Sequence, residues 1–263
     1  MAHMGQDDRD MDVPLFEDDF AAEGVIEPAR VVPAVDMPEC AVACFFGEVV
    51  GEVVPGRSDA RQVTVLSSEA GPSPVWEIEL SGRRLAVFHP GVGAPLAAAY
   101  LEEVIAMGCR RIVACGGAGA LVPELVMGHA AVVESAVRDE GTSYHYLPAS
   151  RVVVADAHAV ATLVEVLDGA GVAHIRGRTW TTDAFYRETR SRLQRRLTEG
   201  CVLVEMEAAA LIAVAMYRSV TLGHVLLAGD SLAGETWDDR GWTSARAARE
   251  RLFWIAAEAA LSL

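Results

Sequence analysis

Short apolar runs alternate with longer amphipathic stretches along the chain, from about residue 40 to its end. Continuous apolar runs of four to eight residues are typical of buried strands, and apolar residues three or four positions apart are typical of helices. The pattern predicts strands over 40–46, 62–66, 75–80, 84–88, 111–115, 129–137, 173–180, 201–204 and 221–228. It predicts helices ending near residue 107 and over 157–170, 188–199, 206–218 and 244–261, with a helical turn from Glu48.

Strands that alternate with helices of 10 to 18 residues predict one α/β domain over 38–263. We expect a central mixed, largely parallel sheet flanked by helices. Ligands of such sheets bind beyond the carboxyl ends of the strands. The informative loops should therefore be those that follow residues 46, 88, 115, 180, 204 and 228.

Charge divides the chain into two parts. Of the formal net charge of −15, residues 1–40 carry −9, from eleven acids and two arginines, and the other 223 residues carry −6. We expect residues 1–37 to form a poorly ordered acidic extension. The acidity argues against a nucleic-acid polymer or an anionic membrane as partner. No apolar run reaches the roughly 18 residues of a membrane span.

The five cysteines form no CxxC pair and mostly lie in apolar runs, which predicts reduced, buried thiols in a cytoplasmic protein. The first 24 residues have no apolar central segment, so we expect no signal peptide. The seven histidines form no ligand set of the HExxH kind, so we predict neither a metal nor another cofactor.

Residues 204–208 (VEMEA) carry the most functional information, because two carboxylates flank a methionine where an apolar strand meets an alanine-rich helix. Glu207 at the mouth of a pocket would accept two hydrogen bonds from a vicinal diol. The alternative is an exposed first helical turn, where the helix dipole favours acids.

Five motifs in order resemble the nucleoside phosphorylase family of uridine phosphorylase, hexameric purine nucleoside phosphorylase and methylthioadenosine nucleosidase. They are PGVGAP at 90–95, CGGAG at 115–119, TDAFY at 182–186, VEMEA at 204–208 and GDSLAGETW at 229–237. The resemblance implies cleavage of a nucleoside N-glycosidic bond with release of the free base. It assigns the ribose hydroxyls to Glu207, with Glu205 beside it, and sugar packing to Met206.

The base-binding residues implied by the resemblance are Phe185 and Asp230. Phe185 would stack on the base, and Asp230 would protonate a purine at N7; the alternatives are a core aromatic and a helix N-cap. Pyrimidine-specific relatives lack this aspartate, and their uracil-reading Gln and Arg are replaced here by Thr189 and Ser191. A purine-type nucleoside is therefore expected.

The acceptor site departs from the family. Phosphorolytic members carry arginines where this chain has Val49, Ala114 and Gly71, in loops that also contain Phe46 and Gly117. A dianion without cationic partners is costly to bury, and Glu48 falls where hydrolytic relatives position the attacking water. We therefore expect hydrolysis, with phosphorolysis to ribose 1-phosphate as the alternative. The residues available to rebuild a phosphate site, or to read the base or an anionic substituent, are His89, Arg138, Arg187 and Arg240.

Two other classes compete with this interpretation. A dinucleotide-binding oxidoreductase needs a third glycine, which the run at 115–121 (CGGAGAL) lacks. A non-catalytic binding protein on the same scaffold would not need Glu207, Asp230 and Phe185 together. The resemblance also implies a homodimer, or a hexamer built from dimers, with a nucleoside and, in phosphorolysis, inorganic phosphate as substrates.

Overall fold

The computed structural model describes residues 13–17 and 19–263. Its strands are β1 (Cys40–Cys44), β2 (Arg61–Ser68), β3 (Gly71–Leu80), β4 (Arg83–Phe88), β5 (Arg111–Ala120), β6 (Ala130–Asp139), β7 (Val152–Val154), β8 (His174–Thr182), β9 (Cys201–Glu205) and β10 (Thr221–Ser231). Its α-helices are α1 (Pro28–Val31), α2 (Ala94–Met107), α3 (Ala157–Gly169), α4 (Arg190–Thr198), α5 (Ala208–Tyr217) and α6 (Arg246–Ser262). One π-helical turn, Val49–Val53, follows β1.

The ten strands form one mixed sheet, and part of it closes on itself. β5 pairs with β10 on one side and with β9 on the other, and β6 and β8 complete the path between them, so five strands form a ring. β1 also pairs with β5 and begins the open part, β1–β4–β3–β2. The prediction of one α/β domain with a mixed central sheet is confirmed. Parallel pairing is less dominant than expected, because five of the ten strand pairs are antiparallel.

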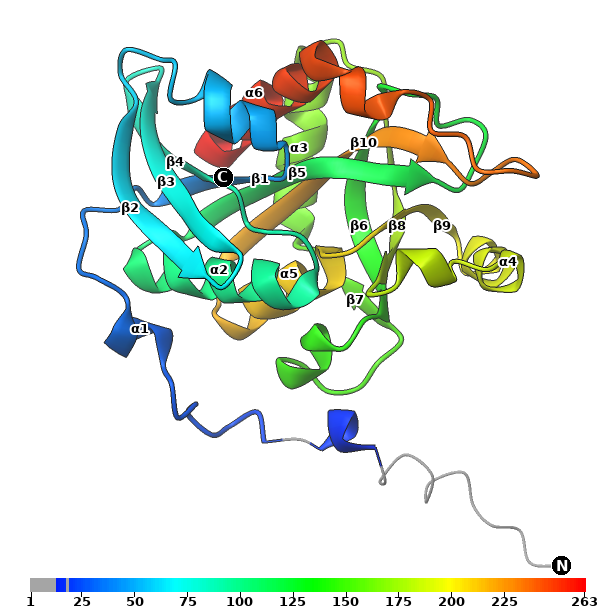
Figure 1. Cartoon of the computed structure of the whole chain (residues 1–263), viewed down its shortest axis with the longest axis horizontal. Coiled ribbons are helices and arrows are strands. Elements are labelled where there is room, and N and C mark those ends of the chain that lie inside the picture. Colours follow the sequence, from blue (N-terminus) through cyan, green and yellow to red (C-terminus); the bar gives the residue numbers. More distant parts are fainter. Residues whose placement is uncertain (1–12, 18) are drawn as a thin grey trace, which may run out of the picture.

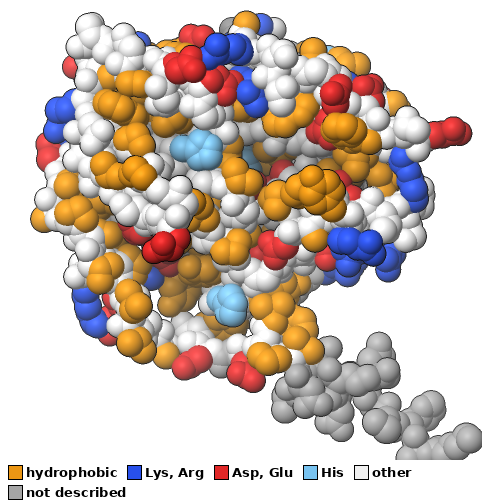
Figure 2. Space-filling model, in the orientation of Figure 1, with side chains coloured by type: hydrophobic (Ala, Val, Ile, Leu, Met, Phe, Trp, Pro, Cys, Tyr) orange, Lys and Arg blue, Asp and Glu red, His pale blue; other side chains and the backbone are white. Residues whose placement is uncertain are grey.

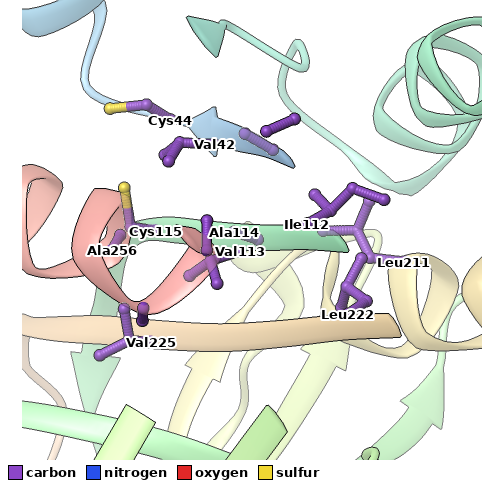
Figure 3. Packing of buried hydrophobic residues seen from close by; sticks show 14 of the residues in the cluster. Val42, Cys44, Ile112, Val113, Ala114, Cys115, Leu211, Leu222, Val225 and Ala256 are labelled. Carbon is purple, nitrogen blue, oxygen red and sulfur yellow. The ribbon is translucent and has the colours of Figure 1, made fainter. Parts of the chain in front are cut away.

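Helices cover both sides of the sheet (Figure 1). α2 and α5 pack together on one side, and α3 and α6 on the other. Figure 3 shows how β5 contributes to both layers: Ile112 lies with Leu222 and Leu211 of α5, whereas Cys115 lies towards Ala256 of α6. β5 is apolar on both faces for this reason, as expected of a central strand.

Several element boundaries differ from the prediction. β5 does not end at residue 115 but continues through the glycine-rich stretch to Ala120. Helix α5 begins at Ala208, two residues later than expected, which leaves Glu207 at its N-cap position. Helix α4 begins at Arg190, after a separate 3₁₀ turn at Phe185–Arg187. The short strand β7 was not predicted; its three residues are too few for a clear apolar pattern.

The acidic N-terminal segment is only partly described, and residues 1–12 and 18 lie outside the described residues. Its described part contains a 3₁₀ turn, Pro14–Phe16, and helix α1. The Phe16 ring contacts the edge of the Tyr144 ring with centroids 5.4 Å apart, and Glu27 forms an ion pair with Arg218 at 3.4 Å. Part of the segment expected to be poorly ordered therefore contacts the domain.

Among the described residues, no helix combines the length and the apolar character needed to cross a membrane. The same residues contain no group of three or more His, Cys, Asp or Glu side chains arranged to hold a metal ion. All five cysteines are free and buried.

Candidate active site

A cavity of about 630 Å³ opens at the carboxyl ends of β5, β9 and β10. Figure 1 shows these strand ends facing the start of α4, and Figure 2 shows apolar and acidic side chains gathered on that side of the face. The lining comes from four segments of the sequence, 117–119, 185–188, 204–206 and 230–242: Gly117, Ala118, Gly119, Phe185, Tyr186, Glu188, Val204, Glu205, Met206, Asp230, Leu232, Trp237 and Trp242. The predicted positions at the ends of strands 111–115, 201–204 and 221–228 thus meet in one cavity.

Glu205 caps helix α5 from inside the protein. Its Oε2 accepts hydrogen bonds from the backbone N–H groups of Glu207 and Ala208 at 2.7 and 2.6 Å, and its Oε1 accepts from the Thr181 hydroxyl at 2.6 Å. The Glu205 carboxyl group thereby provides acceptors for N–H groups of the first helical turn that have no partner within the helix. Burial raises the pKa of Glu205 although the hydrogen bonds oppose this. Both oxygens of Glu205 are occupied, so its side chain supports the start of α5.

The Glu207 side chain does not cap helix α5, although an acid at the N-cap position usually does. Instead its Oε1 accepts a hydrogen bond from the backbone N–H of Gly93 at 2.6 Å. The side chain is only 7% exposed, and burial together with the neighbouring Glu205 raises its pKa. The predicted loop at 90–95 and the VEMEA segment therefore meet across 114 residues of sequence.

Two glycines determine the backbone path of the PGVGAP loop at 90–95. Gly91 and Gly93 have φ of +81° and +90°, a region that other residues rarely adopt. A Cβ atom added at Gly91 would lie 2.4 Å from Leu96, so the loop also needs the missing side chain. The result is a tight turn that directs the Gly93 N–H towards Glu207.

Aromatic rings form the opposite end of the cavity. Phe185 and Tyr186 are 51% and 89% exposed, with ring centroids 4.1 Å apart, so Phe185 is not a core aromatic. Trp242 lies flat over the glycines of β5 and β10. A Cβ atom at Gly117 would lie 2.9 Å from the indole ring, and one at Gly229 would lie 3.2 Å from it.

Two carboxyl groups face this aromatic end. Asp230 Oδ2 accepts a hydrogen bond from the Trp237 indole N–H at 2.7 Å. Glu188 lines the same cavity, and burial, followed by the charge of Asp230, raises its pKa to about 7. Glu188 was not among the sequence candidates; the signal for it was an acid two residues after an exposed aromatic pair.

The predicted water-positioning residue, Glu48, is engaged by a cation that the sequence analysis missed. Arg249 of α6 donates to Glu48 Oε1 at 2.7 Å, and its guanidinium lies about 5 Å from the ring centroids of both Phe46 and Trp242. Both side chains are largely buried, with 12% and 18% exposure. Glu48 is therefore an ion-pair partner in this structure.

The other residues predicted to bind phosphate do not lie together around one cavity. Arg138 is buried outside the cavity and donates to Ser143, Ser150 and the backbone carbonyls of Leu147 and Pro148, so it is a structural cation.

Arg240 is held by the Leu125 carbonyl at 2.8 Å and by Asp238, and Arg187 is exposed beside the aromatic pair. His89 lines a second cavity, of about 300 Å³, together with Gly47 and Gly91. Burial lowers its pKa, so it is neutral at pH 7.

Comparison with known proteins agrees with this architecture. A purine nucleoside phosphorylase from Toxoplasma gondii, solved with immucillin-H, superposes with a TM-score of 0.74 and 21% identity over 86% of this chain and 91% of that one. A uridine phosphorylase from Vibrio fischeri gives a TM-score of 0.69 at 21% identity, over 86% and 90% of the two chains. At this identity the two structures show the fold.

Sequence relatives match shorter stretches. The uridine phosphorylase of Escherichia coli is 27% identical over 164 residues, which is 57% of this chain and 65% of that enzyme, just under two-thirds of its length. A guanosine phosphorylase from Halorubrum lacusprofundi is 29% identical over 165 residues, 60% of this chain and 68% of that enzyme. The model of the phosphorylase superfamily matches residues 40–258, most of the chain. With the strand-end cavity and the buried Glu207 in the matched region, the chain belongs to the phosphorylase superfamily.

Proposed function

We propose that this protein cleaves the N-glycosidic bond of a nucleoside in the 630 Å³ cavity. The observation that carries the proposal is Glu207, a buried carboxyl group next to Met206 of the cavity wall, which caps no helix and is anchored by one oxygen to Gly93. A buried acid that costs stability and has no structural partner of opposite charge is typical of a functional site. The cavity volume lies in the usual range for small-molecule sites.

The cavity offers a division of roles along its length. At the sugar end, Glu207 accepts hydrogen bonds from the ribose diol and Met206 packs against the ring. As the glycosidic bond breaks, the sugar gains positive charge, which a nearby carboxylate stabilises. At the other end, Phe185 and the two tryptophans contact the base, and Asp230 lies beside them.

The base is proposed to be one that carries a ring N–H beside a carbonyl group, as uracil, hypoxanthine and guanine do. No Lys, Arg or His lines the cavity among the described residues, and the Asp230 side chain in its wall offers oxygen atoms that accept hydrogen bonds. The names of the relatives, uridine and guanosine phosphorylases, fit this class of base. Asp230 favours the purine members of the class.

For the acceptor we propose phosphate, which fits the relatives' names and the engagement of Glu48 by Arg249. Water is the second candidate, because neither this cavity nor the one beside His89 is lined by an arginine or lysine within 13–17 and 19–263. A phosphate in the cavity beside His89 would rely on neutral donors such as the backbone N–H of Gly47, because the N–H of Gly91 already donates to His89 Nδ1 at 3.0 Å.

One experiment tests the reaction, the base and the acceptor together. Uridine, inosine, guanosine and adenosine are incubated with the protein, with and without phosphate, and base and sugar products are separated by chromatography. We expect base release and ribose 1-phosphate with the oxo-bases only when phosphate is present. Free ribose at the same rate in phosphate-free buffer would assign water as the acceptor. Failure to release base from any nucleoside would refute the catalytic proposal, and quenching of tryptophan fluorescence would then indicate a binding protein.

A further inference from the structure

The two carboxyl groups at the base end of the cavity have different surroundings. Asp230 accepts a hydrogen bond from Trp237 at 2.7 Å, and a donor of this kind stabilises the ionised form. Glu188 receives no hydrogen bond and forms no ion pair with any residue that the structure describes; burial and the charge of Asp230 are the only influences on it. Two carboxyl groups in one cavity do not both ionise readily, so the group without a donor keeps its proton.

The position of Glu188 is fixed by its neighbours. Its backbone N–H donates to the Phe185 carbonyl at 3.2 Å, which closes the 3₁₀ turn that carries the exposed aromatic pair. Two residues later, the Arg190 guanidinium donates to the carbonyl groups of Leu232 and Glu235 at 2.9 and 2.5 Å. These bonds tie the segment of Glu188 to the segment that follows Asp230, so the two carboxyl groups are held in the same cavity.

The charged groups around Glu188 offer it no counter-ion. Arg190, on its own segment, points to the carbonyl groups across the cavity mouth, and Arg187 is exposed and does not line the cavity. Glu205 and Glu207, the other acids nearby, lie at the sugar end, where Glu205 is saturated with hydrogen bonds. The pKa of Glu188, about 7, is that of a group able to give up a proton near neutral pH.

We propose that Glu188 is the general acid that protonates the leaving base, while Asp230 accepts the ring N–H of the base. This rests on the proposed function and divides between two residues what the sequence assigned to Asp230 alone. In the reaction, the electron pair of the C1′–N bond passes to the base, and the proton leaves the Glu188 hydroxyl for a base nitrogen or carbonyl oxygen. C1′ bonds to an oxygen of hydrogen phosphate, whose released proton restores Glu188 through solvent.

The test compares two substrates across pH. One is the best natural nucleoside from the panel, and the other is 4-nitrophenyl riboside, whose leaving group departs without a proton. Both need Glu207, so the ratio of their kcat/KM values cancels the titration of the sugar site and isolates base protonation. We expect this ratio to be constant below about pH 7 and to fall about tenfold per pH unit above it.

Two variants separate Glu188 from Asp230. Glu188→Gln should lower the ratio about 10²- to 10⁴-fold and remove its pH dependence, while 4-nitrophenyl riboside is cleaved almost as before. Asp230→Asn should raise KM for the nucleoside and move the break in the ratio to lower pH, since a negative neighbour of Glu188 is lost. Glu235→Gln, an exposed acid of the same cavity mouth, is the matched control and should change neither.

The opposite pattern would overturn the proposal. If Asp230→Asn abolishes the pH-dependent ratio and Glu188→Gln leaves it intact, Asp230 is the acid. If Glu188→Gln slows both substrates equally, Glu188 is structural, and a circular dichroism melt shows whether the fold is changed. If the unmodified protein cleaves neither substrate, the proposed function itself fails, which is a separate result.

Discussion

Replacing Glu207 by glutamine removes the carboxylate, which the raised pKa of about 8 makes the main form only above pH 8, and keeps the shape of the side chain. The amide oxygen still accepts the Gly93 N–H, so the loop and the start of α5 should keep their positions. What is lost is the attraction between a carboxylate and the developing cationic sugar. Two unit charges about 5 Å apart, at an effective dielectric constant of about 20, attract by about 3 kcal/mol. The weaker neutral hydrogen bond to the diol adds about 1 kcal/mol.

Above pH 8, where the carboxylate is the main form, the Glu207→Gln variant should therefore lose about 10²- to 10³-fold in kcat/KM, which corresponds to about 3 to 4 kcal/mol of transition-state stabilisation. The assay is initial-rate base release by chromatography, with 4-nitrophenyl riboside as a second substrate. Activity within threefold of the unmodified protein, in a variant with the same circular dichroism spectrum, would refute the assignment of Glu207 to the sugar.

The pH dependence of stability gives an independent check on Glu207, and its direction follows from the raised pKa of this group. The folded protein holds this proton more tightly than the unfolded chain does, so stability falls as pH rises from the ordinary value of 4.5 through the raised value. The glutamine variant lacks this titration. Its melting temperature should equal that of the unmodified protein in acid and exceed it at pH 8 to 9. A lower melting temperature at alkaline pH would mean that the ionised carboxylate stabilises the fold.

Three further predictions concern the support of the site and the assembly. Glu205→Ala leaves two backbone N–H groups of α5 and the Thr181 hydroxyl without their acceptor, so we expect a loss of about 3 kcal/mol in the free energy of unfolding, measured by urea denaturation; a loss below 1 kcal/mol would contradict the capping role. Gly117→Ala should displace Trp242, shift the tryptophan emission and raise KM, whereas Gly169→Ala, with no heavy atom near the added Cβ, should change neither. Light scattering at micromolar concentration should give at least the mass of a homodimer, and a monomer mass would refute this.

The sequence was informative wherever a local pattern decides the structure. Apolar runs placed the strands, and the acids and aromatics just beyond them fell at the cavity as predicted, as Phe185 and Asp230 show. The glycine run after residue 115 looked like a loop, since glycine has low strand propensity. It remains strand because it pairs with β10 and β9, and Trp242, about 125 residues later, packs against Gly117. The pattern of apolar and polar residues along the sequence does not show the contact with Trp242.

The same limit explains why Glu188 was not predicted and why the partner of Glu48 was not foreseen. Glu188 lies where the polar helical pattern begins, and only the fold shows that it precedes α4 and faces the cavity. Glu48 looked free because its partner, Arg249, is about 200 residues away on the last helix. Ion pairs between distant elements depend on tertiary packing, so a sequence motif predicts the residue and not its partner.

The turn at 90–95 has a kinetic consequence. It connects the small cavity with the carboxyl group proposed to bind the sugar: Gly91 lines the cavity beside His89, and the N–H of Gly93 donates to Glu207. An acceptor that binds against Gly91 would therefore also hold in place the carboxyl group proposed to bind the sugar, because Gly93 lies two residues further along the same loop. We expect the two substrates to bind with synergy, so that each lowers the apparent dissociation constant of the other by the same factor. Turnover would then follow a sequential rather than a ping-pong rate law, with no product leaving before both reactants have arrived.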